Sequence, residues 1–208
     1  MKDYAQINLE QTISESDPFT DERYRQFHRF FPRNAHRILD VGCNTGRGGR
    51  ILKQLAPQLS LSGLDIVKER LDQLPTEVYQ HNILGSCTAI PAADDTFDVI
   101  VAGEFIEHLY AADVNPTLFE MFRTLKIGGR VMLTTPNPGD FKRKSRGKSI
   151  LGGAHVSQHH ADALRQQMRM AGFANVRVLG SGKVTRYLGS HFPVLGLYGS
   201  YLIMGDKF

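Results

Sequence analysis

ILDVGCNTGRGG, residues 38–49, joins a short apolar run to a glycine-rich turn and then to the start of a helical pattern. Glycines at 42 and 46 permit a tight turn and let a ligand approach the backbone closely. The first N–H groups of the helix that follows have no partner within that helix. The stretch therefore predicts a buried strand, a candidate ligand-binding turn and a helix, although plain strand-to-helix connections look similar.

The same alternation continues along most of the chain. Strands are expected at 37–43, 59–66, 78–83, 98–103 and 129–137, and helices at 46–56, 67–74 and 115–125. Strands separated by helices of this length form βαβ units with right-handed crossovers, which give a mainly parallel sheet covered on both faces.

The last third of the chain has a different pattern. A helix at 157–173 precedes strands at 174–181 and 198–207, and no clear crossover helix joins those two strands. Strands connected in this way pair antiparallel. The predicted fold class is therefore α/β: a Rossmann-like, doubly wound, mainly parallel seven-stranded sheet with an antiparallel C-terminal strand.

The N-terminal part is expected to form a lid. The first 17 residues look loosely packed, and a helix starts at Asp17 or Thr20. Its aromatic residues recur at roughly helical spacing, so one face is expected to lie against the body of the protein. We predict a single domain over 1–208, comprising an N-terminal segment with a lid helix (1–31) and an α/β core (37–208).

The composition is that of an ordinary globular protein, with 41% hydrophobic and 22% charged residues. No basic-then-apolar leader is evident, and the apolar stretch at 192–204 is short and broken by glycines, so we expect a soluble protein without a membrane span. Cys43 and Cys87 form neither a disulfide framework nor a zinc motif, which favours a cytoplasmic location. Five of the 25 lysines and arginines lie within FKRKSRGKS (141–149), a run that is typical of a solvated loop and is also suited to an anionic substrate.

Two acids accompany the glycine turn. Asp65 ends the second predicted strand, where a carboxylate can accept hydrogen bonds from both hydroxyls of a ribose. The dinucleotide pattern G-x-G-x-x-G is not met, because Asn44 stands two residues after Gly42. Asp40, two residues before Gly42, can take up a cationic amine. A cofactor with a ribose and an amino-acid cation therefore suits this loop better than a pyrophosphate does.

These motifs resemble those of the class I S-adenosylmethionine-dependent methyltransferases. ILDVGCNTGRGG resembles the first motif of that family and GLDI (63–66) its ribose-binding motif. The resemblance continues through AIPAADDTFDVIVAGEFIEHL (89–109), LFEMFRTLKIGGRVMLTTPNP (118–138) and ADALRQQMRMAGF (161–173). It implies a methyltransferase that uses S-adenosyl-L-methionine as its cofactor.

The resemblance also implies a cofactor site. Asp40 would lie beneath the amino group of the methionine part, and the loop glycines would approach that part. Asp65 would bind the ribose hydroxyls, Ile66 would pack on adenine, and Asn82 would hydrogen-bond the adenine edge, where many relatives have Asp. The implied cofactor-binding residues are Asp40, Gly42, Asn44, Gly46, Asp65, Ile66, Asn82 and Gly103.

GEFIEHL (103–109) places Glu104, Glu107 and His108 at i, i+3 and i+4, on one face of a helix. Methyl transfer from a sulfonium needs alignment and, for a poor nucleophile, a base. An imidazole titrates near neutrality, so the candidate catalytic residues are Glu104, His108 and His155. The alternative is that the glutamates only favour the helix N-terminus and His108 packs at the cleft edge.

A third interpretation is a metal site. Glu-x-x-Glu-His resembles the metal-ligand segment of small-RNA 3′-end methyltransferases and of ubiquinone-pathway O-methyltransferases, although relatives not known for metals share it. A later loop, AHVSQHH (154–160), supplies further imidazoles. Such donors suit Mn²⁺, Fe²⁺, Co²⁺ or Zn²⁺ better than Mg²⁺. The candidate ligands of this divalent metal are Glu104, Glu107, His108 and His159.

The sequence constrains the methyl acceptor less than it constrains the cofactor. The aromatic lid and the basic run suggest a small molecule with polar or anionic groups, and TTPNP (134–138) followed by H-x-S-x-H (155–159) resembles methyltransferases of polysaccharide and natural-product pathways. We therefore expect O-methylation of a small-molecule, saccharide-linked or lipid-linked acceptor. A metal-assisted RNA 2′-O-methyltransferase and a catalytically silent cofactor-binding protein are the alternatives, and the oligomeric state stays open.

Overall fold

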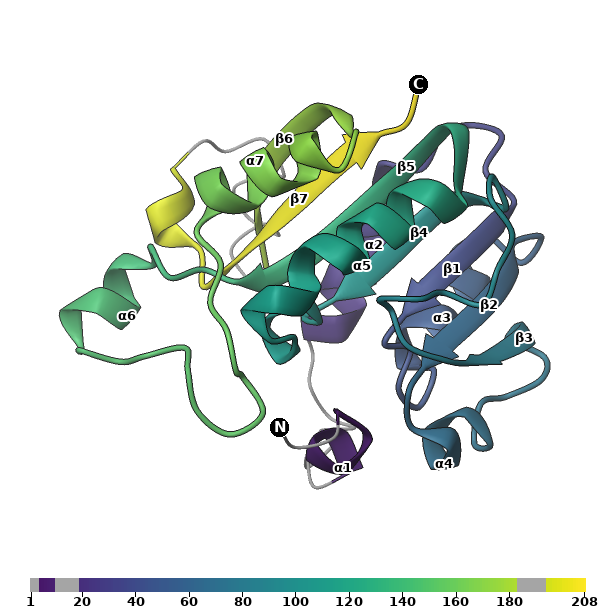
Figure 1. Ribbon diagram of the computed structural model, residues 1–208, viewed down its shortest axis with the longest axis horizontal. Helices are drawn as coiled ribbons and strands as arrows, with labels where there is room; N and C mark the ends of the chain where they lie inside the picture. Colours follow the sequence, from purple (N-terminus) through teal and green to yellow (C-terminus); the bar gives the residue numbers. More distant parts are fainter. Residues whose placement is uncertain (1–3, 10–18, 183–193) are drawn as a thin grey trace.

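A seven-stranded sheet forms the centre of the computed structural model, which describes residues 4–9, 19–182 and 194–208 (Figure 1). The strand order is β3-β2-β1-β4-β5-β7-β6. Strands β1 to β5 are parallel, and β7 runs antiparallel to both β5 and β6, as predicted. The strands are β1 (Arg37–Val41), β2 (Ser60–Asp65), β3 (Tyr79–Leu84), β4 (Phe97–Gly103), β5 (Leu125–Pro136), β6 (Ala174–Ser181) and β7 (Ser200–Asp206).

Helices cover both faces of this sheet. Helices α2 (Phe19–Arg29), α3 (Arg47–Leu55) and α4 (Lys68–Leu71) pack on one face, and α5 (Ala111–Thr124) and α7 (Ala161–Met170) on the other. Side chains alternate along each strand. In β1, Ile38 therefore joins the core under α2 and α3, and Leu39 joins the core under α5 and α7.

Residues 4–9 of the N-terminal segment are more ordered than the sequence predicts. Residues Tyr4–Leu9 form a helix, α1, beyond the carboxyl ends of the central strands (Figure 1). The hydroxyl of Tyr4 donates to Asp113, and the guanidinium of Arg70 donates to the carbonyl of Asn8. These contacts correct the expected loose packing of this part. The expected lid helix is α2, which begins at Phe19, whereas Asp17 lies outside the described residues.

Three local differences affect the site. FIEHL forms a short 3₁₀ helix, η1 (Ile106–His108), and the α-helix expected at 115–125 begins earlier, at Ala111. The basic run contains a helix, α6 (Phe141–Ser145), because the Asp140 carboxylate accepts from the Lys142 N–H at its start. None of the helices in the described ranges is long and apolar enough to cross a bilayer.

Candidate active site

A cleft of about 490 Å³ opens beyond the carboxyl ends of β1, β2 and β4. Loops after these strands form its floor, and α1 and α2 contribute to its cover. Eight of the predicted site residues line it: Gly42, Asn44, Asp65, Ile66, Gly103, Glu104, His108 and His155. Five do not, namely Asp40, Gly46, Asn82, Glu107 and His159, and the surroundings of each explain why.

The loop after β1 is held in a conformation that exposes its backbone to the cleft. Gly42 and Asn44 have φ angles of 68° and 51°, in the left-handed region that favours glycine and tolerates asparagine. The Gly42 N–H donates to the Leu64 carbonyl at 2.8 Å, which ties the loop to β2. Gly46 (φ 79°) faces inward instead, because a Cβ there would lie 2.9 Å from the side chains of Leu74 and Tyr79. Gly46 therefore makes the turn. It does not line the cleft, although it was expected to approach the cofactor.

Asp65 joins two loops of the cleft floor. One carboxylate oxygen accepts from the Asn44 N–H and the other from the Val67 N–H, each at 3.0 Å. A carboxylate oxygen has room for a second hydrogen bond. Asp65 therefore positions the glycine loop and keeps acceptor capacity for a ligand in the cleft.

Asp40 does not reach the cleft, although it was predicted to lie beneath the cofactor amine. Its side chain is fully buried, and its two oxygens accept 2.6 Å hydrogen bonds from the hydroxyls of Tyr24 and Tyr79. Burial raises the pKa of Asp40 to about 6, against the opposing effect of the two phenols. The alternation of side chains in β1 points Asp40 into the core under α3, and Tyr24, one of its two hydrogen-bond donors, lines the cleft.

Asn82 does not line the cleft, and its contact with adenine stays a prediction. It sits inside β3, two residues before the strand ends, and its side-chain amide donates to the Leu71 carbonyl at 3.1 Å. Ser86 and Cys87, just beyond β3, line the cleft instead, and the Gly85 N–H donates to the Asp65 carbonyl. The rule that ligands bind beyond strand ends would have selected these residues.

Arg23 of α2 also lines the cleft, and no motif in the sequence pointed to it. The aliphatic part of Arg23 lies over Gly103, where a Cβ would come 2.9 Å from Cδ. Its guanidinium lies 3.6 Å from Glu104 Oε1, an oxygen with no hydrogen-bond partner among the described residues. The lid helix thus brings a cation beside the carboxylate that follows β4.

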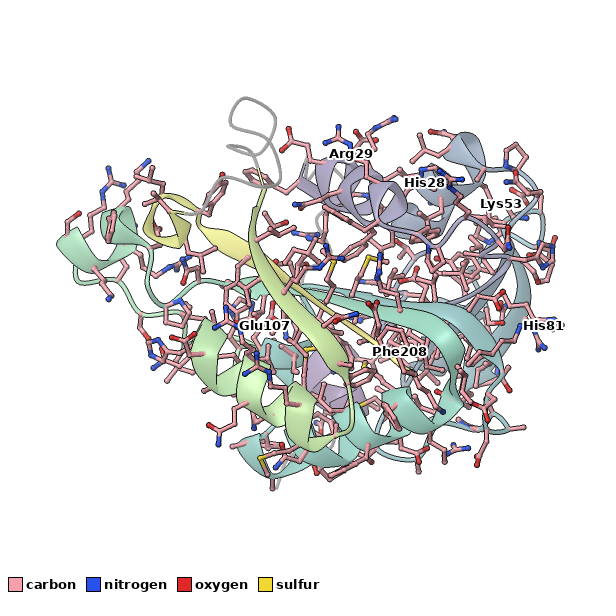
Figure 2. The ribbon with its side chains drawn as sticks, turned by 90° about the horizontal axis from the view of Figure 1, so that it is seen from above. His28, Arg29, Lys53, His81, Glu107 and Phe208 are labelled. Atoms are coloured by element: carbon pink, nitrogen blue, oxygen red, sulfur yellow. The ribbon has the colours of Figure 1, made fainter. Side chains whose placement is uncertain are left out.

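Glu107 is fully buried behind the cleft wall. The hydroxyl of Thr135 donates to its Oε2 at 3.0 Å, and its Oε1 has no hydrogen-bond partner in the described part of the chain. In the view of Figure 2, Glu107 lies away from the outline of the molecule, whereas His81 lies at its right edge. Burial, and then repulsion from Glu104, raise the pKa of Glu107, which favours its protonated form.

His108 and His155 meet at the cleft with ring centroids 4.9 Å apart. The Nδ1 atom of His108 contacts the Ala154 carbonyl at 3.1 Å, and that of His155 contacts the Ile150 carbonyl at 3.2 Å. Since a carbonyl only accepts, Nδ1 carries the proton in each ring and Nε2 is the acceptor nitrogen of the neutral form. Burial, and then the neighbouring His155, lower the pKa of His108 to about 4.

One group of possible metal ligands combines the buried carboxylate with the two imidazoles. Glu107, His108 and His155 each offer one ligand atom, and these atoms lie within 4.8 Å of one another. His159 was expected as the imidazole ligand. Its Nε2 is instead engaged by the Ile106 carbonyl at 3.2 Å and the Ser157 hydroxyl at 2.8 Å, so the structure replaces it with His155. Glu104 pairs with Arg23 and does not belong to this grouping.

The basic run does not contribute to the cleft. None of the residues 141–149 is among the cleft-lining residues of the described chain. The expected role of this run in holding an anionic substrate inside the cleft therefore lacks structural support.

Comparison with known proteins agrees with this geometry. Residues 18–178 match the family described as a methyltransferase domain. A probable S-adenosylmethionine-dependent methyltransferase of Mycolicibacterium smegmatis is 29% identical over 164 residues, which cover 76% of this chain and 61% of the relative. A demethylmenaquinone methyltransferase of Deinococcus radiodurans is 32% identical over 201 residues, which cover 84% of this chain and 76% of the relative.

Solved structures share the fold. The crystal structure of a SAM-dependent methyltransferase from Archaeoglobus fulgidus superposes with a TM-score of 0.70 at 18% sequence identity, covering 90% of this chain and 92% of the other. Curated relatives include proteins named as C-methyltransferases and as O-methyltransferases. The relatives therefore share the methyl donor, and they do not identify the acceptor of this chain.

Proposed function

The chain belongs to the class I S-adenosylmethionine-dependent methyltransferases, and we propose that it transfers the methyl group to a hydroxyl oxygen of a small acceptor, free or linked to a saccharide or lipid. S-adenosyl-L-methionine is the methyl donor. The acceptor is inferred from the chemistry of the cleft wall.

The pair of imidazoles carries this proposal. A hydroxyl is a poor nucleophile until its proton is removed, and a neutral imidazole at hydrogen-bond distance can remove it. His108 and His155 line the cleft with Nδ1 anchored on backbone carbonyls, which fixes the rings and leaves Nε2 as the accepting atom. An amine acceptor would gain less from such a base.

The cofactor is proposed to lie across the strand ends. In this arrangement the remaining acceptor capacity of Asp65 receives the ribose hydroxyls, Ile66 packs on adenine, and Ser86 and Cys87 face the adenine edge. The backbone at 42–44 faces the methionine part. Gly103 and Glu104 then lie beside the transferred methyl group, next to His108.

The cover of the cleft supports a small acceptor over a folded RNA. Tyr4 and Asn8 of α1 and Arg23 and Tyr24 of α2 all line the same cleft as the strand-end loops. A cleft of about 490 Å³ with such a cover is of the size that holds small molecules.

Methyl transfer from cofactor labelled with CD₃ to a panel of hydroxylated acceptors tests the proposal. We expect the label on oxygen, located by mass spectrometry and NMR. His108→Gln should lower kcat by about 10²- to 10⁴-fold, the usual contribution of a general base, while calorimetry shows an unchanged cofactor Kd. Label on carbon or nitrogen would overturn the assignment of the acceptor atom. Cofactor binding without transfer to any acceptor would support a silent binding protein.

A metal-assisted form of the same reaction is a second candidate, favoured by the unsatisfied oxygen of Glu107. That fully buried carboxylate lies with His108 and His155 in a grouping of one oxygen and two nitrogen donors, a set suited to Mn²⁺, Fe²⁺, Co²⁺ or Zn²⁺. Both imidazoles are oriented through Nδ1 by backbone carbonyls, as metal-bound histidines commonly are. A bound divalent ion would act as a Lewis acid that lowers the pKa of an acceptor hydroxyl.

Metal binding can be measured without turnover. Protein stripped with chelator should bind Co²⁺ with a visible d–d absorption and release protons, since Glu107 must ionise to bind. Glu107→Gln and His155→Ala should abolish the absorption, whereas His160→Ala, at a neighbouring exposed histidine, should retain it. Absence of Co²⁺ binding together with full activity after chelation would leave the imidazole base as the sole candidate.

A further inference from the structure

The basic run and a neighbouring 3₁₀ helix form an exposed surface that the cleft does not use. It combines four exposed cations, Lys142, Lys144, Arg146 and Lys148, with four exposed apolar side chains, Phe141, Leu151, Val194 and Leu197. Figure 1 shows α6 and the loop after it standing out from the body of the protein. We call these eight residues the basic–apolar surface.

The positive charge of this surface is not neutralised locally. Asp140 is the sole acid between residues 137 and 161, and its carboxylate caps α6 by accepting from the Lys142 N–H. No ion pair found in the described ranges uses a cation of residues 142–148. The surface is therefore complementary to a dense array of negative charge.

Three of the four apolar side chains lie where α6 meets a short 3₁₀ helix. The Phe141 ring rests on Gly196 of η2 (Leu195–Leu197), where a Cβ would come 2.3 Å from the ring. Val194 and Leu197 flank that glycine and are 42% and 47% exposed, and Phe141 itself is 57% exposed. Apolar side chains gathered at one place on a surface usually mark an interaction site.

We propose that the basic–apolar surface docks on an anionic lipid bilayer. Clustered Lys and Arg are attracted to anionic headgroups, while Phe, Leu and Val can enter the boundary between headgroups and acyl chains. Single-stranded RNA would use aromatic side chains for base stacking, and the apolar members other than Phe141 are aliphatic. The combination therefore fits lipid better than nucleic acid.

Docking in this way would bring the cleft to the bilayer. The chain runs from Lys148 through Ile150 to His155, and the Ile150 carbonyl holds the ring of His155 at the cleft wall. The surface and the cleft rim are thus linked by a few residues. The inference does not depend on which atom the enzyme methylates, because the surface residues lie outside the cleft.

Flotation of the full chain with lipid vesicles tests the inference. We expect binding to vesicles of phosphatidylcholine with one third phosphatidylglycerol at low salt, and none to vesicles of phosphatidylcholine alone. At about 1 kcal/mol for each basic residue near such a surface, replacing the four cations by Gln should weaken binding by roughly 100-fold or more. The double variant Leu151→Ser, Leu197→Ser should weaken vesicle binding. The binding that remains should be electrostatic and should disappear at high salt.

A matched variant removes the same charge elsewhere. Arg29, Arg33, Arg50 and Arg169 are exposed arginines outside the basic–apolar surface, and their replacement by Gln should leave vesicle binding within about twofold, because exposed charges more than a Debye length from the bilayer are largely screened. Thermal unfolding followed by circular dichroism should show that all variants are folded. Three results would overturn the inference: no binding to phosphatidylglycerol vesicles, an equal loss in the matched variant, or tight binding of single-stranded RNA in place of vesicles.

Discussion

The hydroxyl of Tyr24, on the lid helix, donates a 2.6 Å hydrogen bond to Asp40 at the end of the first strand. Tyr79 donates to the other oxygen, and the Gly49 N–H donates to the Tyr79 hydroxyl at 3.1 Å. One buried carboxylate therefore joins α2, β1, β3 and the start of α3. The lid is fixed to the strand that carries the glycine loop, so its position and the shape of the cofactor cleft depend on each other.

The ionisation of Asp40 should make the protein less stable as pH rises. Its pKa is about 6 in the folded protein and 3.8 without burial. The folded state therefore holds the proton more tightly, and stability falls as pH rises through this interval. The difference in unfolding free energy between wild type and Asp40→Asn, from urea denaturation, should decrease by up to about 3 kcal/mol between pH 4 and 7. Parallel pH profiles for the two proteins would contradict this.

Gly48→Ala should displace the lid helix. A Cβ at this position would lie 2.0 Å from the Tyr24 ring, which cannot move away without giving up its bond to Asp40. We expect a loss of about 1–3 kcal/mol in unfolding free energy, the usual cost of overpacking, and a weaker cofactor Kd. Gly199→Ala is the control, because nothing lies within 4 Å of its added Cβ. Similar melting temperatures for the two variants would show that the lid is not tightly packed.

Asn82 and Ser86 should differ sharply in their effect on cofactor binding. Asn82 lies outside the cleft, so Asn82→Ala should leave the Kd for S-adenosylmethionine unchanged in calorimetry. Ser86 lines the cleft, and Ser86→Leu would place a larger side chain in it, with an expected loss of at least roughly tenfold in affinity, the effect of one poorly fitted group. A strong effect of Asn82→Ala with none of Ser86→Leu would restore the original assignment.

Asp65→Asn should lower the affinity for the cofactor without unfolding the chain. An amide nitrogen replaces one carboxylate oxygen and cannot accept the backbone N–H, of Asn44 or Val67, that this oxygen received, and the bonds to the other oxygen lose their charge assistance. Each such bond is worth about 1.5–3 kcal/mol, so the Kd should rise roughly 10- to 150-fold for one bond to the ribose. Asp72→Asn, an exposed acid paired with Lys68, should bind the cofactor normally. Equal affinities for the two variants would exclude Asp65 from the ribose site.

The sheet could be predicted because its evidence is local. Each strand is an apolar run, and each connection has the length of a crossover helix, so pattern alone gives the order of elements and their parallel pairing. The antiparallel pairing of β6 and β7 followed from the sequence between them, which has no clear pattern of a crossover helix. The helix α1 was missed because its order depends on contacts with Asp113 and Arg70, which are more than 60 residues distant in sequence.

The site was predicted only as far as the backbone direction of each strand could be inferred. Asp65, Ile66 and Gly103 lie at or just beyond strand ends, and they line the cleft as expected. Asp40 and Asn82 also belong to the predicted motifs. The alternation of side chains in β1 turns Asp40 into the core, and Asn82 lies two residues before the end of β3. The exchange of His159 for His155 rests on loop geometry, since the Ile106 carbonyl engages one imidazole and the Ile150 carbonyl orients the other.

The place of β7 constrains how the chain acquires its structure during synthesis. This strand is translated after β5 and β6 but lies between them, paired with β5 from Arg130 to Pro136 and with β6 from Ala174 to Ser181. Until Asp206 has left the ribosome, β5 is an unpaired edge and β6 has no neighbour in the sheet. The five parallel strands that carry the cofactor loops can assemble while translation continues. The sheet next to Glu107 and His155 can close only after β7 has emerged, so the acceptor side of the enzyme is completed last.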